Sequence, residues 1–322
     1  MAALCAALCV AIPARAAVPT VPGFIVEDYA VALDPWKLSF DASGALFVGR
    51  DNRGSGGADL DSVKIHRIPA GGGAASEFGV TTLFDPDAIL IDHTGALSGT
   101  AGSVLVGSKF GATGNGFLFA IAPDQSITTL INDTTDFADP ADMALDGLGR
   151  LLIADQDLNQ VVLRTAGVNT TLFSLPAAPR DLAINAMDLI FTSSNDGLIR
   201  IHDSTGALVD GAWSAGLGTL APIEFGPGGA VWGDSLYSMS GAGDLIRFDA
   251  AGNQTIIGTG FGANITDIEF GPGNALYLSS FDEDKIIRVL VPEPGTSLLL
   301  VMGAAAALFR RRRPGLRLPR RE

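Results

Sequence analysis

Cysteine is almost absent from this chain, and the two that occur, Cys5 and Cys9, both lie in the first ten residues. That segment has the features of a signal peptide, which export machinery removes. The mature protein is therefore expected to contain no cysteine, so no disulfide stabilises it and no thiol serves as nucleophile or metal ligand. Its stability outside the cytoplasm must come from noncovalent packing.

The first twenty residues carry the signal-peptide pattern. An apolar run extends from Ala2 to Ile12, and Ala14-Arg15-Ala16 follows it as a small-residue cleavage site. This predicts a signal peptide over residues 1–16, a mature protein that begins at Ala17, and export of the chain. The basic residues that usually precede such a run are missing here, so a buried N-terminal helix remains the alternative.

Basic residues are scarce in the expected mature protein. The whole chain has 21 Lys+Arg and 35 Asp+Glu, a formal net charge of −14. Without Arg15, the seven arginines of the C-terminal tail and Glu322, the counts become 13 basic and 34 acidic residues, a net charge of about −21. A surface of this sign repels nucleic acid and attracts cations. Nucleic acid is therefore not expected as a partner.

The residue patterns of nucleophilic catalysis are also lacking. The three histidines, His66, His93 and His202, are far apart in the sequence, and no G-x-S-x-G stretch occurs. No catalytic residue is assigned from the sequence, and each histidine is interpreted as structural.

No apolar run is long enough to be a comfortable transmembrane helix. The longest one near the C-terminus, Leu298 to Phe309, would form a helix of roughly 18 Å, against a hydrocarbon thickness of about 30 Å. Arg310, Arg311, Arg312 and Arg313 follow it directly. By the positive-inside rule, these arginines would stay in the cytoplasm and leave the preceding chain outside.

This tail resembles the PEP-CTERM sorting signal of Gram-negative, biofilm-forming bacteria. The resemblance rests on Pro292-Glu293-Pro294, the short apolar helix and the arginine cluster, in that order. It implies sorting to the cell envelope or the extracellular surface, with an exosortase-type processing enzyme as partner and only transient membrane insertion of the C-terminal helix. A simple C-terminal membrane anchor is the alternative for residues 292–322.

The body between the two ends is a sixfold repeat. Six segments align, with starts separated by 51, 54, 39, 41 and 45 residues: PWKLSFDASGALFV from Pro35, PDAILIDHTGAL from Pro86, PADMALDGLGRLLIA from Pro140, PRDLAINAMDLIFT from Pro179, LAPIEFGPGGAVW from Leu220 and ITDIEFGPGNALYL from Ile265. Apolar residues recur three and five places after each start, which is the period of a strand. A turn rich in Asp and Gly, a second apolar strand and a third strand follow in each unit.

Six small antiparallel sheets of this kind can bury both faces only by stacking radially, so we predict an all-β, six-bladed β-propeller over residues 17–291. The segment Gly23 to Leu33 precedes the first inner strand and belongs to no unit. We expect it to supply the outermost strand of the last blade and to close the ring.

The repeat resembles TolB-like six-bladed propellers, including NHL-repeat proteins and the gluconolactonase-type superfamily. LIADQDLNQVVLR, from Leu152 to Arg164, is especially similar to an NHL blade. The resemblance implies a fold that hosts hydrolases, lyases, dehydrogenases and binding modules, so it does not select a reaction. A quinone-dependent dehydrogenase is disfavoured, because its His and Arg set cannot be placed here.

Aspartates are expected to gather at one mouth of the central channel. In a propeller, the loops that enter the inner strands and those between the second and third strands open on the same face. They carry Asp34, Asp51, Asp85, Asp139, Asp142, Asp155, Asp157, Asp181, Asp196, Asp244, Asp267, Asp282 and Asp284. Carboxylates are suitable ligands for calcium or magnesium. The metal candidates are Asp139, Asp142, Asp155, Asp157, Asp181 and Asp267, with Ca²⁺ as the candidate cofactor; a solubilising acidic rim is the alternative.

Two functions are compatible with this sequence. The first is a non-enzymatic, envelope- or exopolysaccharide-associated propeller whose acidic face binds a cation, a glycan such as exopolysaccharide, or an envelope protein. The second is a divalent-metal-dependent hydrolase or lactonase of the gluconolactonase-like type, in which the metal would polarise a carbonyl or activate water.

Overall fold

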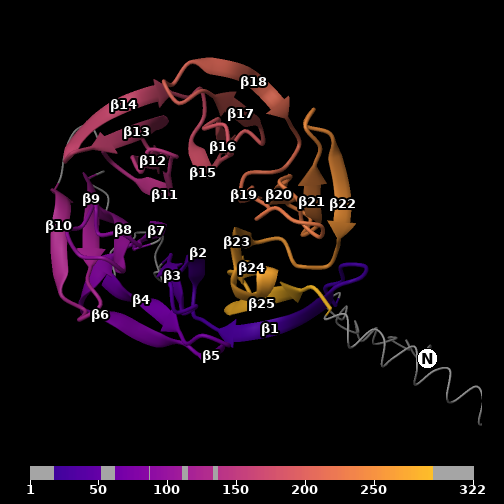
Figure 1. Cartoon of the computed structure of the whole chain (residues 1–322), viewed down its shortest axis with the longest axis horizontal. Helices are drawn as coiled ribbons and strands as arrows, with labels where there is room; N and C mark the ends of the chain where they lie inside the picture. Colours follow the sequence, from indigo (N-terminus) through magenta and orange to yellow (C-terminus); the bar gives the residue numbers. More distant parts are fainter. Residues whose placement is uncertain (1–17, 52–61, 87, 111–114, 133–136, 293–322) are drawn as a thin grey trace, which may run out of the picture.

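Six β-sheets form a ring in the computed structural model (Figure 1). The structure describes residues 18–292, except 52–61, 87, 111–114 and 133–136. The predicted all-β six-bladed propeller is confirmed. The expected signal peptide and the C-terminal helix lie outside the described residues. In the part of the chain that is described, no helix has the length and apolar character needed to cross a bilayer.

Blades 1 to 5 each have four strands that run in chain order from the centre of the ring to the rim. Blade 1 contains β2 (Pro35–Phe40), β3 (Leu46–Arg50), β4 (Ser62–Ile68) and β6 (Ser76–Phe84), and blade 2 contains β7 (Ala88–Asp92), β8 (Ser103–Phe110), β9 (Asn115–Ile121) and β10 (Ile127–Asn132). Blade 3 contains β11 (Pro140–Leu145), β12 (Leu151–Asp155), β13 (Gln160–Thr165) and β14 (Val168–Ser174).

Blades 4 and 5 repeat this plan, whereas blade 6 takes its fourth strand from the N-terminal part of the chain and adds a short fifth strand. Blade 4 contains β15 (Pro179–Ile184), β16 (Ile190–Ser194), β17 (Ile199–His202) and β18 (Leu208–Ser214), and blade 5 contains β19 (Ile223–Phe225), β20 (Leu236–Met239), β21 (Leu245–Phe248) and β22 (Gln254–Gly258). Blade 6 contains β23 (Ile265–Gly271), β24 (Ala275–Ser280), β25 (Lys285–Leu290) and β1 (Ile25–Val31), with the short helix η2 (Pro272–Asn274) and the two-residue strand β5 (Gly73–Ala74).

Aspartate side chains shape the turns at the end of the inner strands. In blade 1, Asp41 Oδ1 accepts hydrogen bonds from the backbone N–H groups of Ser43 and Ala45, both at 2.9 Å. Asp146 Oδ1 accepts equivalent bonds from Leu148 and Arg150 in blade 3. Such bonds satisfy backbone donors that no strand can pair. The recurring Asp at this place in the repeat therefore reverses the chain between the first and second strands.

The apolar faces of each blade are covered by its neighbours. Between blades 6 and 1, the ring of Tyr277 lies between Phe40 and Tyr29, with centroid distances of 4.6 Å and 5.0 Å. These rings pack with buried Leu38 and Val48 in one cluster. Full burial of such a side chain contributes about 1.5–3 kcal/mol. Because every blade lacks a core of its own, each depends on the two beside it.

The N-terminal strand closes the ring, as predicted. β1 pairs antiparallel with β25, from Ile25 opposite Leu290 to Val31 opposite Lys285, so the indigo and yellow ends of the described chain lie side by side in Figure 1. One detail differs from the expectation: β1 is not outermost, because β5 pairs with it in parallel. Gly72, just before β5, permits this contact, since a Cβ there would lie 2.5 Å from the carbonyl oxygen of Tyr29.

The residues before β1 fasten blade 5 to blade 6. Thr20 forms an antiparallel bridge with Thr259, which follows β22. Val21 is buried in the cluster shared by the two blades, and the ring of Phe24 lies 4.7 Å from that of Trp232. The residues before β1 therefore contribute to two blades, and not only to the strand that closes the last one.

The propeller has two distinct faces because its strands alternate in direction. The loops that enter the inner strands and those between the second and third strands form what we call the mouth face. The turns after the inner strands, and those between the third and outer strands, form the opposite tail face. Pairing of Pro140 with Asp155 near the mouth face and of Leu145 with Leu151 near the tail face illustrates this polarity.

Deletion of residues 20–33 should lower the melting temperature by at least about 10 °C. The deletion removes the pairing and packing that close the ring and with them several kcal/mol of folding free energy. Each kcal/mol lost lowers the melting temperature of a protein of this size by about 2–4 °C. The open ring would also expose two sheet edges. Val31→Ala, at a position of β1 that is 73% exposed, is the control and should leave melting nearly unchanged. Thermal unfolding followed by circular dichroism measures both, and a deletion variant that melts with the parent would contradict closure by β1.

Candidate functional site

Two rings of side chains from the inner strands surround the channel, although Ala88 is packed in an apolar cluster between blades 2 and 3. Because side chains alternate along a strand, the residues two and four places into each repeat face away from the apolar positions at three and five. The ring near the mouth face is Lys37, Ala88, Asp142, Asp181, Pro222 and Asp267. The deeper ring is Ser39, Leu90, Ala144, Ala183, Glu224 and Glu269. Most of these side chains border the large open cavity of the channel.

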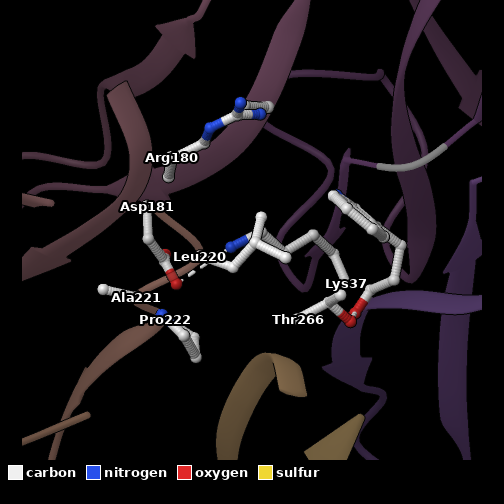
Figure 2. Close-up of a pocket in the computed structure, with 9 residues that line it drawn as sticks. Lys37, Arg180, Asp181, Leu220, Ala221, Pro222 and Thr266 are labelled. Atoms are coloured by element: carbon white, nitrogen blue, oxygen red, sulfur yellow. Dashed lines mark hydrogen bonds and ion pairs between the residues drawn. The ribbon is translucent and has the colours of Figure 1, made fainter. Parts of the chain in front are cut away.

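Lys37 lies at the centre of the first ring and contacts three carboxylates. Its Nζ is 2.9 Å from Asp181 Oδ2, 3.4 Å from Asp142 Oδ1 and 3.4 Å from Asp267 Oδ1. Figure 2 shows the contact with Asp181, next to a small pocket bordered by Arg180. All four side chains are buried. Burial alone would lower the pKa of Lys37, but the three carboxylates outweigh it and raise that pKa above its ordinary value.

The same three carboxylates also connect neighbouring blades. The Leu38 N–H of blade 1 donates to Asp267 Oδ2 of blade 6 at 2.7 Å. In the same way, the Leu182 N–H donates to Asp142 of the preceding blade at 2.8 Å, and the Ile223 N–H donates to Asp181 at 2.9 Å. Each aspartate therefore accepts from the inner strand of the next blade. These carboxylates are structural acceptors as well as partners of Lys37.

The deeper ring adds two carboxyl groups, Glu224 and Glu269. Burial, reinforced by Asp267 and Asp142, raises the pKa of Glu224 to about 8. Burial and the neighbouring Glu224 raise the pKa of Glu269 well above its ordinary range. Burial likewise raises the pKa of Asp267 to about 7, although Lys37 opposes the shift. Burial in the channel therefore favours the protonated forms of Glu224, Glu269 and Asp267.

The remaining predicted metal residues lie in a second group, in blade 3. Lys109 Nζ is 2.8 Å from Asp139 Oδ2 and 3.0 Å from Asp157 Oδ2. Asp155 does not join that ion pair: its oxygens accept from the N–H groups of Ala138, Asp139 and Leu158. Asp155 therefore holds the loop that enters the inner strand, as a capping side chain does.

Five of the six predicted metal ligands thus fall into two groups, each with a lysine, and Asp155 belongs to neither. Asp142, Asp181 and Asp267 meet at Lys37, whereas Asp139 and Asp157 meet at Lys109. Among the described residues, no three His, Cys, Asp or Glu side chains are grouped so that they could hold a metal ion. A lysine ammonium lies where a cation would be expected. Binding of calcium by these residues stays a prediction.

The other ionisable side chains of the mouth face and the histidines are separate from these groups. Asp196 pairs with Arg200, and Asp282 accepts from the amide of Asn264 at 2.6 Å. His202 stacks on Phe173 with ring centroids 3.7 Å apart. Burial and the nearby Arg50 lower the pKa of His66 to about 4. None of these described contacts joins a nucleophile to a base.

Lys37, Lys109, Glu224 and Glu269 are the site residues that the sequence analysis missed. Strand alternation contained the signal for three of them: Lys37 is two places into its repeat, and Glu224 and Glu269 are four places into theirs. A charged residue at either place lies on the side of its inner strand opposite the apolar positions at three and five. Lys109 has no such signal, because it lies at the end of a second strand and meets Asp139 across 30 residues of sequence.

Comparisons with known proteins found matches for the C-terminal tail and for the propeller body. Residues 290–313 match the model of the PEP-CTERM protein-sorting motif. The body is similar in fold to a gluconolactonase from Xanthomonas campestris, with a TM-score of 0.63, 14% identity and coverage of 84% of this chain and 91% of the other. No curated protein matches the sequence.

Two further solved structures share the fold. One is virginiamycin B lyase from Staphylococcus aureus, with a TM-score of 0.57, 15% identity, and coverage of 84% of this chain and 100% of the other. The other is the PQQ-bound aldose sugar dehydrogenase from Streptomyces coelicolor, with a TM-score of 0.58, 14% identity, and coverage of 87% and 99%. At such identities the likeness establishes the propeller fold and no reaction.

Replacing Glu224 and Glu269 together by glutamine should raise the melting temperature by roughly 10 °C at pH 9 and change it little at pH 5. In the parent, the pKa of Glu224 rises from 4.5 to about 8 on folding. Such a group costs stability progressively as pH rises through that interval, because the unfolded state ionises freely there whereas burial makes the folded state keep its proton. Glu77→Gln, at an exposed position, is the control. Calorimetry at both pH values provides the test, and equal gains at pH 5 and pH 9 would contradict it.

Lys37→Met should destabilise the protein by about 3–5 kcal/mol at pH 8, because three buried carboxylates lose their counter-ion. The loss should shrink at pH 5, where protonation of the carboxyl groups replaces the missing positive charge. Lys64→Met is the matched control, since Lys64 pairs with the exposed Glu77 at 3.9 Å and such surface pairs contribute at most about 1 kcal/mol. Urea unfolding gives the free energies; identical effects of the two substitutions at pH 8 would refute a structural role for Lys37.

Proposed function

We propose that this protein is an exported β-propeller, delivered to the envelope or surface of a Gram-negative bacterium by its C-terminal signal, that acts there as a binding module and not as an enzyme. The observation that supports the proposal is that the channel carboxylates are already bonded within the protein. Asp142, Asp181 and Asp267 contact Lys37 and the backbone of adjacent blades. Groups committed to the scaffold in this way are poor candidates for binding a catalytic metal.

The sorting part of the proposal rests on the C-terminal motif. A match to the PEP-CTERM model over residues 290–313 implies export and processing by an exosortase. We assign recognition to Pro292, Glu293 and Pro294, and retention of the tail during transit to Arg310, Arg311, Arg312 and Arg313. The apolar run between them would insert only transiently, and residues 1–16 would be removed as a signal peptide.

The ligand class follows from charge and exposure. Asp157, Asp196 and Asp282 are exposed on the mouth face, and the mature chain is strongly acidic. A cation, an exopolysaccharide or an envelope protein with basic groups fits such a surface. The TolB-like and NHL-repeat likeness of the blades agrees with an interaction role, because those repeats recur in propellers that bind partners.

A metal-dependent hydrolase or lactonase remains the second candidate. It is favoured by the fold shared with the gluconolactonase from Xanthomonas campestris and by the number of carboxyl groups in the channel. For this function, Ca²⁺ would have to bind among Asp142, Asp181 and Asp267 and displace the ammonium of Lys37, or bind at Asp139, Asp155 and Asp157 against Lys109.

Calcium titration of residues 17–291 by calorimetry, together with assays on lactone and phosphoester substrates, separates the two candidates. The binding module should show no turnover in the presence or absence of calcium. Turnover that a chelator abolishes, with calcium binding weakened by Asp181→Asn, would overturn the proposal and support the hydrolase. Asp41→Asn, on the tail face, is the matched control for loss of a negative charge.

A further inference from the structure

The chain leaves the propeller on the tail face. β25 begins beside the mouth face, where Lys285 pairs with Val31, and ends where Leu290 pairs with Ile25. In the other blades this position is the turn from the third strand to the outer strand. The described residues Val291 and Pro292 continue from there. The tail that carries the sorting motif therefore departs opposite the carboxylate-rich mouth.

The connection between the body and the apolar run is short. Seven residues, 291–297, separate Leu290 from the run that begins at Leu298. Fully extended, they span at most about 25 Å, at 3.3–3.6 Å per residue. When the apolar run is in a membrane, the end of β25 must then lie within that distance of the bilayer surface. The tail face is thereby held near the lipid.

Exposed apolar side chains are distributed over this face. Leu148 and Met187, at the turns after the inner strands of blades 3 and 4, are 76% and 75% exposed. Val231 in blade 5 and Ile25 beside the chain exit in blade 6 are also exposed. Four consecutive blades thus present an apolar side chain on the side from which the tail departs. Such side chains can enter the interfacial region of a bilayer at little cost.

We propose that, while the tail is inserted, the propeller rests with its tail face against the lipid surface and opens its carboxylate-lined mouth away from it. The occupant of the tail face is the bilayer to which the chain is attached. The proposal rests on the proposed function in one respect: the sorting tail is taken as the point of attachment. To the proposed function it adds the orientation of the propeller on the membrane, with the mouth face open to a ligand.

Charge attraction does not hold the body in this orientation. Asp124 and Asp249 lie in turns of the tail face, so anionic lipid would repel both faces. Contact then depends on the tether and on the apolar side chains. A membrane of neutral lipid is consequently the appropriate test surface.

Two leucines of one blade allow a matched test. Leu148 lies in the turn between β11 and β12, and Leu158 lies in the turn between β12 and β13, at opposite ends of the five-residue strand β12. At about 3.3 Å per residue, that strand alone separates the two turns by about 17 Å. Replacement of Cys5 and Cys9 by serine leaves a chain without cysteine, into which Leu148→Cys or Leu158→Cys is introduced.

The full-length variants are labelled with a fluorescent donor and reconstituted into phosphatidylcholine–phosphatidylethanolamine vesicles that carry a headgroup-linked acceptor. Flotation first measures attachment. Energy transfer should then be severalfold higher from Leu148→Cys than from Leu158→Cys in the floated, outward-facing fraction. Equal transfer, or higher transfer from Leu158→Cys, in chains that float would overturn the orientation and leave the sorting proposal intact. Chains that do not float would overturn attachment by the tail, and the orientation with it.

Discussion

The structure depends on one constraint: no blade can bury both of its apolar faces without a neighbour on each side. A four-stranded sheet has too little material to form its own core, so the favourable free energy lies between blades. The cluster that joins Phe40 and Leu38 of blade 1 to Tyr277 of blade 6 is as much a part of the core as any contact within a sheet. The ring is consequently cooperative, and the N-terminal strand that completes blade 6 influences every other blade.

Polar bonds follow the same route around the ring as the apolar contacts. Asp267 accepts from blade 1, Asp142 from blade 4 and Asp181 from blade 5, and the Ser39 hydroxyl accepts from the Ile91 N–H of blade 2 at 3.1 Å. Each is a side chain of one inner strand bonded to the backbone of the next. Inner strands at the channel cannot pair with a further strand, so these side chains satisfy backbone donors that would otherwise be buried without a partner.

The fold could be predicted from the sequence because it is encoded by a repeated, local pattern. Period-two apolar residues, Asp-Gly turns and six similar units specify the blades, and the surplus segment Gly23 to Leu33 had no place except the open edge of blade 6. The candidate site was harder to predict. Aspartates near strand starts indicated the mouth, but the ion pairs depend on contacts such as that of Lys37 with Asp267, which are 230 residues apart. The position of Lys37 in its repeat shows on which side of the strand its side chain lies. Its partners, in contrast, depend on which blades lie around it in the folded ring.

The residues of the channel also limit what can be inferred about the function of this chain from other propellers of the same fold. A lactonase, a lyase and a sugar dehydrogenase share this ring, so their chemistry must differ through the residues that face the channel or its mouth. In this chain, the ring near the mouth contains Lys37 and three aspartates that contact it, and each of those aspartates also accepts a hydrogen bond from the next blade. A divalent cation entering there would meet Lys37 and would compete with backbone donors for the same oxygens. Binding would therefore be opposed both by charge repulsion and by loosening of the ring, which is why the mouth and outer surface, and not the channel interior, are the better places to look for a ligand.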